Sequence, residues 1–366
     1  MSEFDDRNIT KTLEETDKKC PDCAGIMEFD PKTGGLFCPY CGHIEAIPLD
    51  FDEAKKAEEL SFLSAENVEN CNWGVDKKTV LCKACGGESI YDALQTSATC
   101  PFCGSNQVME ANTQNTIAPG GVVPFQISDK EASEYFKKWI KKKWFCPKMA
   151  KESAKAKAFN GVYLPYWTFD TSTDSEYQAK FGRDRTVHDR DGKTRIETDW
   201  FRTSGAYHQF INDELVLATT RHDNNMLKGL EPFLTENNKV YKPEYIAGFV
   251  SERYSVGLKL AWDHAKESIE NTLKYEITGK IKTEKNADHV SNLLVETAFL
   301  DITYKYLMLP VWFSNFKYKD KVYQFMVNGQ TGKVAGKTPI SVWKVLLTIF
   351  IVLLVLGAIW LLGEIS

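Results

Sequence analysis

The chain has 366 residues, of which 43% are apolar and 26% charged, and these fractions exclude a wholly disordered chain, a collagen and a multi-pass transporter. The formal net charge of -5 hides an uneven distribution, because residues 1–115 hold 21 acidic and 10 basic side chains and the remainder is net basic. An acidic N-terminal third disfavours nucleic-acid binding, since affinity for the phosphate backbone comes mainly from Lys and Arg.

Eight of the ten cysteines form four Cys-x2-Cys pairs, grouped in two units in which fourteen residues separate the pairs. Two residues between cysteines let a tight turn present both thiolates to one tetrahedral Zn²⁺, and a glycine after the last cysteine frees the backbone there. The sequence therefore predicts two structural zinc ions in two zinc ribbons. The predicted ligands are Cys20, Cys23, Cys38 and Cys41 in the first ribbon, and Cys82, Cys85, Cys100 and Cys103 in the second.

A redox Cys-x-x-Cys is the competing interpretation, but it calls for one pair near a βαβ unit rather than four pairs at fixed spacing. His43 and Cys71 lie near the predicted sites, and we interpret both as bystanders because four sulfurs already complete each site. We interpret Cys146 as a buried apolar residue.

The segment between the ribbons, residues 50–70, carries apolar side chains at helical spacing among charges. This spacing predicts an amphipathic helix that packs on the second ribbon or on Trp73, or a linker that folds on a partner. The apolar positions are Phe51, Ala54, Ala57, Leu60 and Leu63. The break at residues 119–121 marks the end of the zinc module.

A capping box at Ser128 and Glu131 predicts a helix that runs to about Trp144. Its lysines form a basic face, which is either a solvated surface or a contact with anionic lipid or an acidic protein surface. A Leu-Pro-x-Trp motif then occurs twice, at residues 164–167 and 309–312, each time after a helical pattern and before hairpin patterns. We therefore expect two α+β units, each a curled sheet on one helix, with the Trp and Phe stripes in the sheet core.

Residues 345–362 form an uncharged apolar run that spans roughly 27 Å as a helix, close to the thickness of a bilayer core. Lysines precede this run and Glu364 follows it, so the positive-inside rule places the N-terminal body in the cytoplasm. The first ten residues lack the features of a secretory signal. The sequence thus predicts a single-pass, tail-anchored protein of the cell membrane.

Catalytic motifs are missing or incomplete. The stretch from Gly332 to Thr338 resembles a phosphate-binding loop, but three residues separate its glycines where four are required. The histidines stand at spacings that do not suit a shared metal ion. We expect no enzymatic activity.

The fold class expected is α+β, with two N-terminal zinc ribbons, a duplicated helix-plus-antiparallel-sheet body and one C-terminal transmembrane helix. The expected regions are a disordered N-terminus (1–19), zinc ribbon 1 (20–47), an acidic helical linker (48–77), zinc ribbon 2 (78–112), the duplicated α+β body (113–339) and the transmembrane helix (340–363).

The cysteine units, the two Leu-Pro-x-Trp motifs, the run from Val327 to Lys333 and the apolar C-terminal run together resemble a bacterial family of membrane-anchored TFIIB-type zinc-ribbon proteins. The resemblance covers essentially the whole chain. It implies association with a phage-shock-protein-A homologue and a flotillin-like (SPFH) protein in an envelope-stress system. The function expected is a tail-anchored scaffold that recruits such partners to the membrane. The alternative is nucleic-acid binding or transcription control by the ribbons, which the acidic charge of residues 1–115 opposes.

Overall fold

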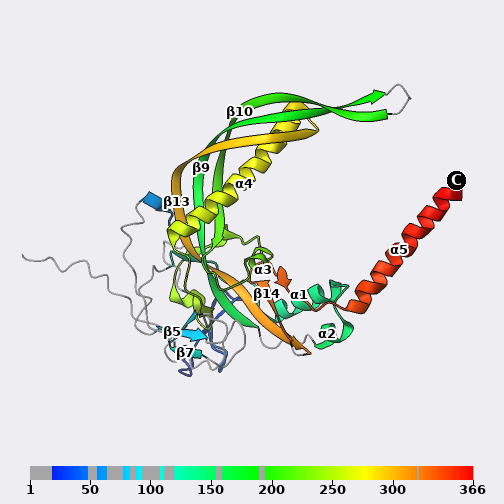
Figure 1. Ribbon diagram of the computed structural model, residues 1–366. Helices are drawn as coiled ribbons and strands as arrows, with labels where there is room; N and C mark the ends of the chain where they lie inside the picture. The colour runs from blue at the N-terminus through cyan, green and yellow to red at the C-terminus, as the bar shows by residue number, and fades with distance from the viewer. Residues whose placement is uncertain are drawn as a thin grey trace, which may run out of the picture.

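Three very long strands organise the structure (Figure 1). The computed structural model describes residues 19–47, 56–63, 77–82, 88–92, 108–110, 119–153, 159–188, 194–319 and 321–365. Within them the strands are β1 (Glu28–Asp30), β2 (Gly35–Phe37), β3 (Ile44–Glu45), β4 (Leu60–Ser61), β5 (Lys77–Cys82), β6 (Glu88–Asp92), β7 (Val108–Glu110), β8 (Gly121–Val122), β9 (Asn160–His188), β10 (Thr194–Leu217), β11 (Lys239–Val240), β12 (Val250–Ser251), β13 (His289–Tyr318), β14 (Lys321–Asn328) and β15 (Val334–Gly336). The helices are α1 (Asp129–Lys142), α2 (Lys148–Ser153), α3 (Asn224–Lys228), η2 (Thr235–Asn237), η3 (Pro243–Ile246), α4 (Leu258–Lys285) and α5 (Val342–Ile365).

The strand β9 lies at the centre of the main sheet. It pairs along nearly its whole length with β13 on one edge, and on the other edge with β10 and, near its start, with β12. At about 3.3 Å per residue, the 29 residues of β9 extend over roughly 95 Å. The strands β8, β4 and β14 continue the sheet beyond β13.

The two Leu-Pro-x-Trp motifs lie on neighbouring strands of this sheet and meet at their first residues. Leu309 of β13 pairs with Leu164 of β9, and the motifs run antiparallel from that point. The side chains of Trp167 and Trp312 are both buried, and each indole N–H donates to a backbone carbonyl, that of Val256 and that of Ile127. The tryptophans are therefore core residues, as expected, but the predicted two separate curled sheets are wrong, because both halves of the chain share one sheet.

A bend divides the sheet into two regions. The neighbours of β9 on both sides carry a β-bulge at the same level, between Ile211 and Glu214 in β10 and between Leu300 and Thr303 in β13. Such bulges bend and twist a strand. We call the sheet beyond them, residues 171–188, 194–211 and 289–300 together with α4, the arm, and the sheet before them with its covering segments the base.

The helix α4 covers one face of the arm, and in Figure 1 the sheet curves over it. Its buried side chains recur every fourth residue, so they form one stripe. The stripe packs on side chains of β9, β10 and β13 in the arm, and at its start, through Ala261 and Ala265, on the core of the base. The helix ends at Asn286 in the left-handed conformation, a usual stop signal. The stripe consists of Ala261, Ala265, Ile269, Leu273, Ile277 and Ile281.

The predicted helix after Ser128 is confirmed as α1, whose capping box forms with Glu131. The predicted linker helix is not observed over residues 56–63, where residues 60–61 form a strand and only residues 62–63 are helical, as part of a short 3-10 turn. There β4 pairs with β13, and the backbone N–H of Ala57 donates to the side chain of Asn238 at 2.7 Å. The free edge of β13 thus offers this segment hydrogen bonds that outweigh its helical periodicity. The remainder of residues 48–77, apart from Lys77, lies outside the described residues.

The C-terminal prediction requires a correction. The helix α5 forms where the apolar run predicts a helix, and it projects from the base beyond α2 (Figure 1). Within the described part of the chain, no helix combines the length and the apolarity that a membrane crossing needs. This contradicts the predicted transmembrane helix and the cell-membrane localisation that depended on it.

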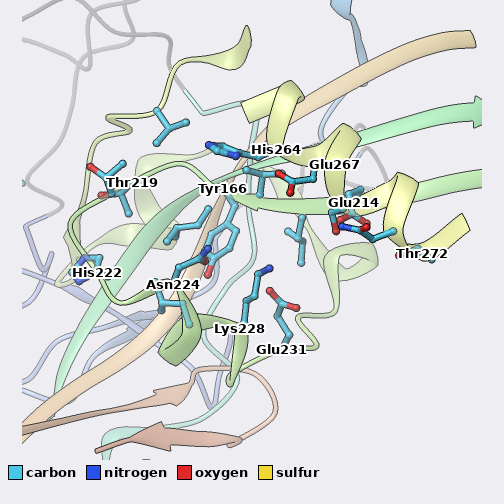
Figure 2. Close-up of a pocket in the computed structure, with 18 of the residues that line it drawn as sticks. Tyr166, Glu214, Thr219, His222, Asn224, Lys228, Glu231, His264, Glu267 and Thr272 are labelled. Carbon is cyan, nitrogen blue, oxygen red and sulfur yellow. The ribbon is translucent and has the colours of Figure 1, made fainter. Parts of the chain in front are cut away.

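A cavity of about 840 Å³ opens where the base meets the arm (Figure 2). Its walls are the end of β10, the helix α3 with the loop that follows it, and residues 264–275 of α4.

Candidate metal centre

Two short turns position the first four cysteines. In each turn the first cysteine, Cys20 or Cys38, accepts a hydrogen bond at its carbonyl from the backbone N–H four residues later and donates its own N–H to the carbonyl five residues later. Gly42 has a φ of +81°, so the expected need for glycine after the last cysteine is met there. In the first turn Ala24 takes the equivalent left-handed position, with a φ of +59°.

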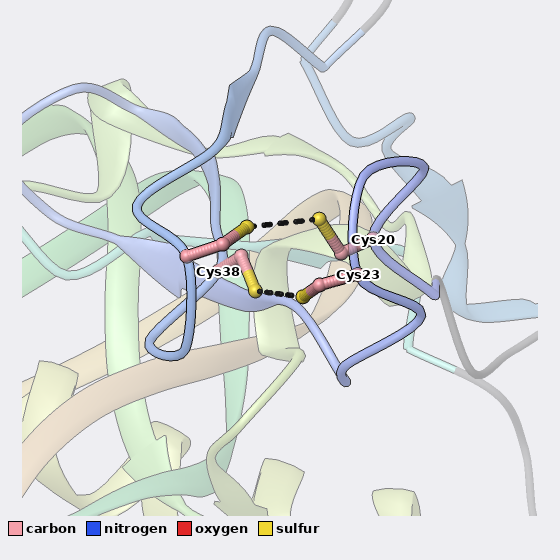
Figure 3. A group of neighbouring side chains, drawn as sticks. Cys20, Cys23 and Cys38 are labelled. Atoms are coloured by element: carbon pink, nitrogen blue, oxygen red, sulfur yellow. Dashed lines mark hydrogen bonds between the residues drawn. The ribbon is translucent and has the colours of Figure 1, made fainter.

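The sulfur atoms of Cys20, Cys23, Cys38 and Cys41 all lie within 4.8 Å of one another. The Sγ atoms of Cys20 and Cys41 are 3.4 Å apart and those of Cys23 and Cys38 are 3.5 Å apart (Figure 3). Zn–S bonds of about 2.3 Å in a tetrahedron place sulfurs roughly 3.8 Å apart. The four sulfurs therefore form a zinc-ribbon-like cluster that could bind a single metal ion.

The electrostatics of the cluster favour a thiolate at Cys38. Burial opposes its ionisation, but hydrogen bonds from the backbone N–H groups of Cys41 and Tyr40, and from neighbouring thiols, lower the pKa of Cys38 to about 7. At Cys41 a backbone hydrogen bond from His43 lowers the pKa, but hydrogen bonds with the other three thiols and burial outweigh it and raise the pKa to about 12. Without a cation, the four sulfurs cannot all be charged at this spacing, so a divalent ion would release protons on binding.

His43 and Asp22 lie beside this cluster. The Nδ1 atom of His43 is 2.7 Å from Oδ2 of Asp22, and both side chains lie within reach of the sulfur of Cys20. A soft metal ion binds the four cysteine thiolates better than the alternative set of Cys20, Asp22 and His43, which offers one thiolate, one carboxylate and one imidazole. The Asp22–His43 pair is thus best placed to orient the turn around the sulfurs.

The first ribbon packs on the base rather than standing free. Its buried Phe29 meets the ring of Tyr245 edge-on at 5.9 Å, and the backbone N–H of Phe29 donates to the carbonyl of Ala247. Leu36 and Met27 are buried in the same core cluster as Trp167. The four-cysteine cluster therefore stabilises a knob that is continuous with the core of the base.

The second predicted site is not assembled within the described residues. Cys82 ends β5, which pairs with β6 and β7, but Cys85, Cys100 and Cys103 lie outside the described residues, as does Cys71. A single four-cysteine cluster is therefore observed in the described part of the chain, where the sequence predicts two. Cys146 is buried as expected, and burial raises the pKa of its thiol.

A buried lysine, which no sequence pattern indicates, lies at the bend. The Nζ of Lys305 lies 2.7 Å from Oδ1 of Asp213, 3.2 Å from Oε1 of Glu59 and 3.6 Å from Oδ2 of Asp170. Burial, and then the hydrogen bond to Glu59, raise the pKa of Asp170 to about 6, despite the opposing effects of the Asp213 N–H and Lys305. These residues come from four distant segments, so no sequence spacing could have revealed the cluster.

A second buried group lies next to the cavity. The carboxylate of Glu252 is fully buried, accepts a 2.6 Å hydrogen bond from Thr219 and lies 2.6 Å from Nε2 of His222. Arg221 approaches the same carboxylate at 3.4 Å. These contacts satisfy a buried charge, which would otherwise carry a large desolvation cost.

Fold and site together define an α+β protein with one large, mainly antiparallel sheet and a four-cysteine cluster of zinc-ribbon type. The chain is 30% identical over 339 residues to the uncharacterized protein YdjG of Bacillus subtilis (strain 168), which covers 89% of this chain and 91% of that protein. It therefore belongs to the same family as YdjG. No family model matches the sequence. No solved structure matches it either.

Proposed function

We propose that this protein is a non-catalytic scaffold, in which a zinc-stabilised base holds the arm as a docking surface for a protein partner. The supporting observation is a set of exposed apolar side chains distributed along one face of the arm, with polar and charged side chains between them. By strand register, these residues share the sheet face opposite α4, and we call this set the convex stripe. It comprises Ile196, Trp200, Phe210, Leu294 and Leu300, with exposed fractions between 43% and 70%.

The edge of the arm supports the same proposal. Over the described residues β10 pairs with β9 alone, so the opposite edge of β10 carries unpaired backbone N–H and C=O groups. An open edge of this kind can take an added strand, which gains affinity from backbone hydrogen bonds and specificity from side chains on the sheet face. The partner proposed is thus a protein that adds an extended segment to β10 and covers the convex stripe.

In this proposal the role of the metal ion is to stabilise the base. Zinc at Cys20, Cys23, Cys38 and Cys41 fixes the knob that packs on η3, and rigid surfaces lose less entropy on binding than mobile ones. The resemblance of the sequence implies partners of the phage-shock-protein-A and SPFH classes. We propose these two classes as the first to be tested.

Site-specific photo-crosslinking in the native cells tests this function. A benzophenone amino acid replaces Phe210 in one variant and Met149, an exposed residue of α2, in the control. We expect one discrete protein adduct from position 210 and none from position 149. No discrete adduct at position 210, or the same adducts at both positions, would overturn the docking role.

The identified partner is then purified and its affinity measured. Trp200→Lys/Phe210→Lys should weaken binding at least tenfold, because charges replace two of the apolar contacts, ten residues apart along β10. The matched control is Met149→Lys/Leu260→Lys, which adds the same charge at exposed apolar sites away from the convex stripe. Metal analysis of the same preparations should find zinc, and Cys20→Ser/Cys38→Ser should lower its content.

A further inference from the structure

The cavity at the junction of base and arm is lined by more acidic than basic side chains. Its lining includes the carboxylates of Glu214 from β10, Glu231 from the loop after α3 and Glu267 from α4. Lys228 is the one Lys or Arg among the lining residues that the structure describes. Figure 2 shows the three carboxylates spread along the cavity rather than gathered at one point. In the described part of the chain, none of the three forms an ion pair within 4 Å.

The surroundings of Glu231 disfavour the charged form of its carboxylate. Burial raises the pKa of Glu231, Lys228 and Lys333 lower it in part, and the nearby Glu214 raises it again. A half-buried carboxylate in such a place is destabilised when charged, and a positive ligand would relieve that cost.

Tyr166 gives an independent indication of a ligand. Its side chain is only 2% exposed, and that remaining surface belongs to the cavity that it lines. Its hydroxyl has no hydrogen-bond partner among the described residues, whereas a buried tyrosine hydroxyl usually has one. Burial and the charge of Glu231 raise the pKa of Tyr166, so the hydroxyl remains a donor and acceptor at neutral pH.

The geometry separates two kinds of cation. A single metal ion needs three or more ligand atoms close together, and among the described residues only groups that include Cys20 meet that condition. The three glutamates do not. Carboxylates spread along a cavity suit a cation whose charges are also separated, and the side chains of Leu215, Leu217 and Leu227 offer apolar contact for the methylenes between them.

We propose that this cavity binds a linear organic polycation, a diamine or polyamine, whose ammonium groups pair with Glu214, Glu231 and Glu267. The volume of about 840 Å³ lies in the range of small-molecule sites. Tyr166 contacts an ammonium group or an adjacent methylene from the cavity floor. This site is separate from the convex stripe, so its test and the docking test fail independently.

Isothermal titration calorimetry of the full chain tests the proposal, with spermidine as the probe and Mg²⁺ as the comparison. Glu231→Gln/Glu267→Gln should weaken spermidine binding at least tenfold, and Lys228→Gln should strengthen it by removing a competing cation. Tyr166→Phe should weaken it about threefold.

The control variant is Glu276→Gln/Glu284→Gln, which removes two exposed carboxylates of α4 that do not line the cavity. The control variant has the same net charge as the cavity variant, so any loss of affinity in it measures the non-specific attraction of spermidine to the charge of the protein. Equal losses in the two double variants, spermidine binding unaffected by the cavity variant, or displacement of spermidine by Mg²⁺ at equal concentration would overturn the proposal. Thermal unfolding of each variant confirms that the measured protein is folded.

Discussion

The base and the arm belong to one sheet but are stabilised in different ways. The base has both faces covered, and its core contains fully buried aromatic residues such as Trp167, Tyr163 and Phe313. The arm has three strands, one covering helix and one open face. Damage to the base should therefore affect the whole molecule, whereas damage to the arm should stay local.

The largest effect is expected in the base. Trp167→Ala removes a side chain with no exposed surface and the hydrogen bond to Val256, which should cost about 3–5 kcal/mol of unfolding free energy. Urea unfolding measures this loss. Trp144→Ala, at an exposed tryptophan, serves as the control and should cost far less. Equal losses of unfolding free energy in the two variants would mean that burial of Trp167 in the base does not contribute specially to stability.

The arm should respond to Ile277→Ala, which empties one position of the stripe on α4 and should cost about 2–4 kcal/mol. Hydrogen exchange measured residue by residue sharpens the comparison. We expect faster exchange at residues 177–181 and 290–295, which pack around Ile277, and unchanged exchange at residues 162–169. Faster exchange across the base as well would show that the two regions unfold as one unit.

The bend between them should make stability depend on pH. Because the pKa of Asp170 is raised to about 6, folding favours its protonated form, so its contribution is present at low pH and lost as pH rises through 6. Relative to Asp170→Asn, the wild type should lose about 1 kcal/mol between pH 5 and pH 7.5. Urea unfolding of both proteins across this range measures the difference. A constant difference would show that Asp170 titrates normally.

The smallest effect is expected on the convex stripe. Trp200 and Phe210 are exposed, so Trp200→Lys/Phe210→Lys should change the unfolding free energy by only about 0.5 kcal/mol per site. The same urea assay measures it. A loss of several kcal/mol of unfolding free energy would mean that these side chains stabilise the fold and are not free to contact a partner.

Local signals allowed good prediction where short-range chemistry decides the structure. The spacing of Cys20, Cys23, Cys38 and Cys41 is sufficient to predict the cluster, because each pair closes its own turn. The capping box at Ser128 predicts the start of α1 for the same reason. The helical pattern around Ala57 failed, because an unpaired strand edge far along the chain determines the conformation there.

The features that depend on distant contacts could not be predicted. The Leu-Pro-x-Trp repeat is visible in the sequence, but spacing does not reveal that Leu164 faces Leu309 within one sheet. The cluster around Lys305 and the cavity at Glu231 each collect residues from several elements. The C-terminal prediction rested on the length and apolarity of residues 345–362 and on the residues that flank them, and no helix in the described part of the chain meets the requirement for a membrane crossing.

The central position of β9 has a consequence for synthesis on the ribosome. Gly182 pairs with His289 and Asn160 with Phe313, so the two partners are roughly 100–150 residues apart in the chain, and pairings this distant fold slowly. While β13 is still being translated, β9 and β10 have only each other and expose a long unpaired edge. The nascent chain would then be most vulnerable to mispairing in that interval, and a chaperone that shields the β9–β10 hairpin would improve the yield of native protein.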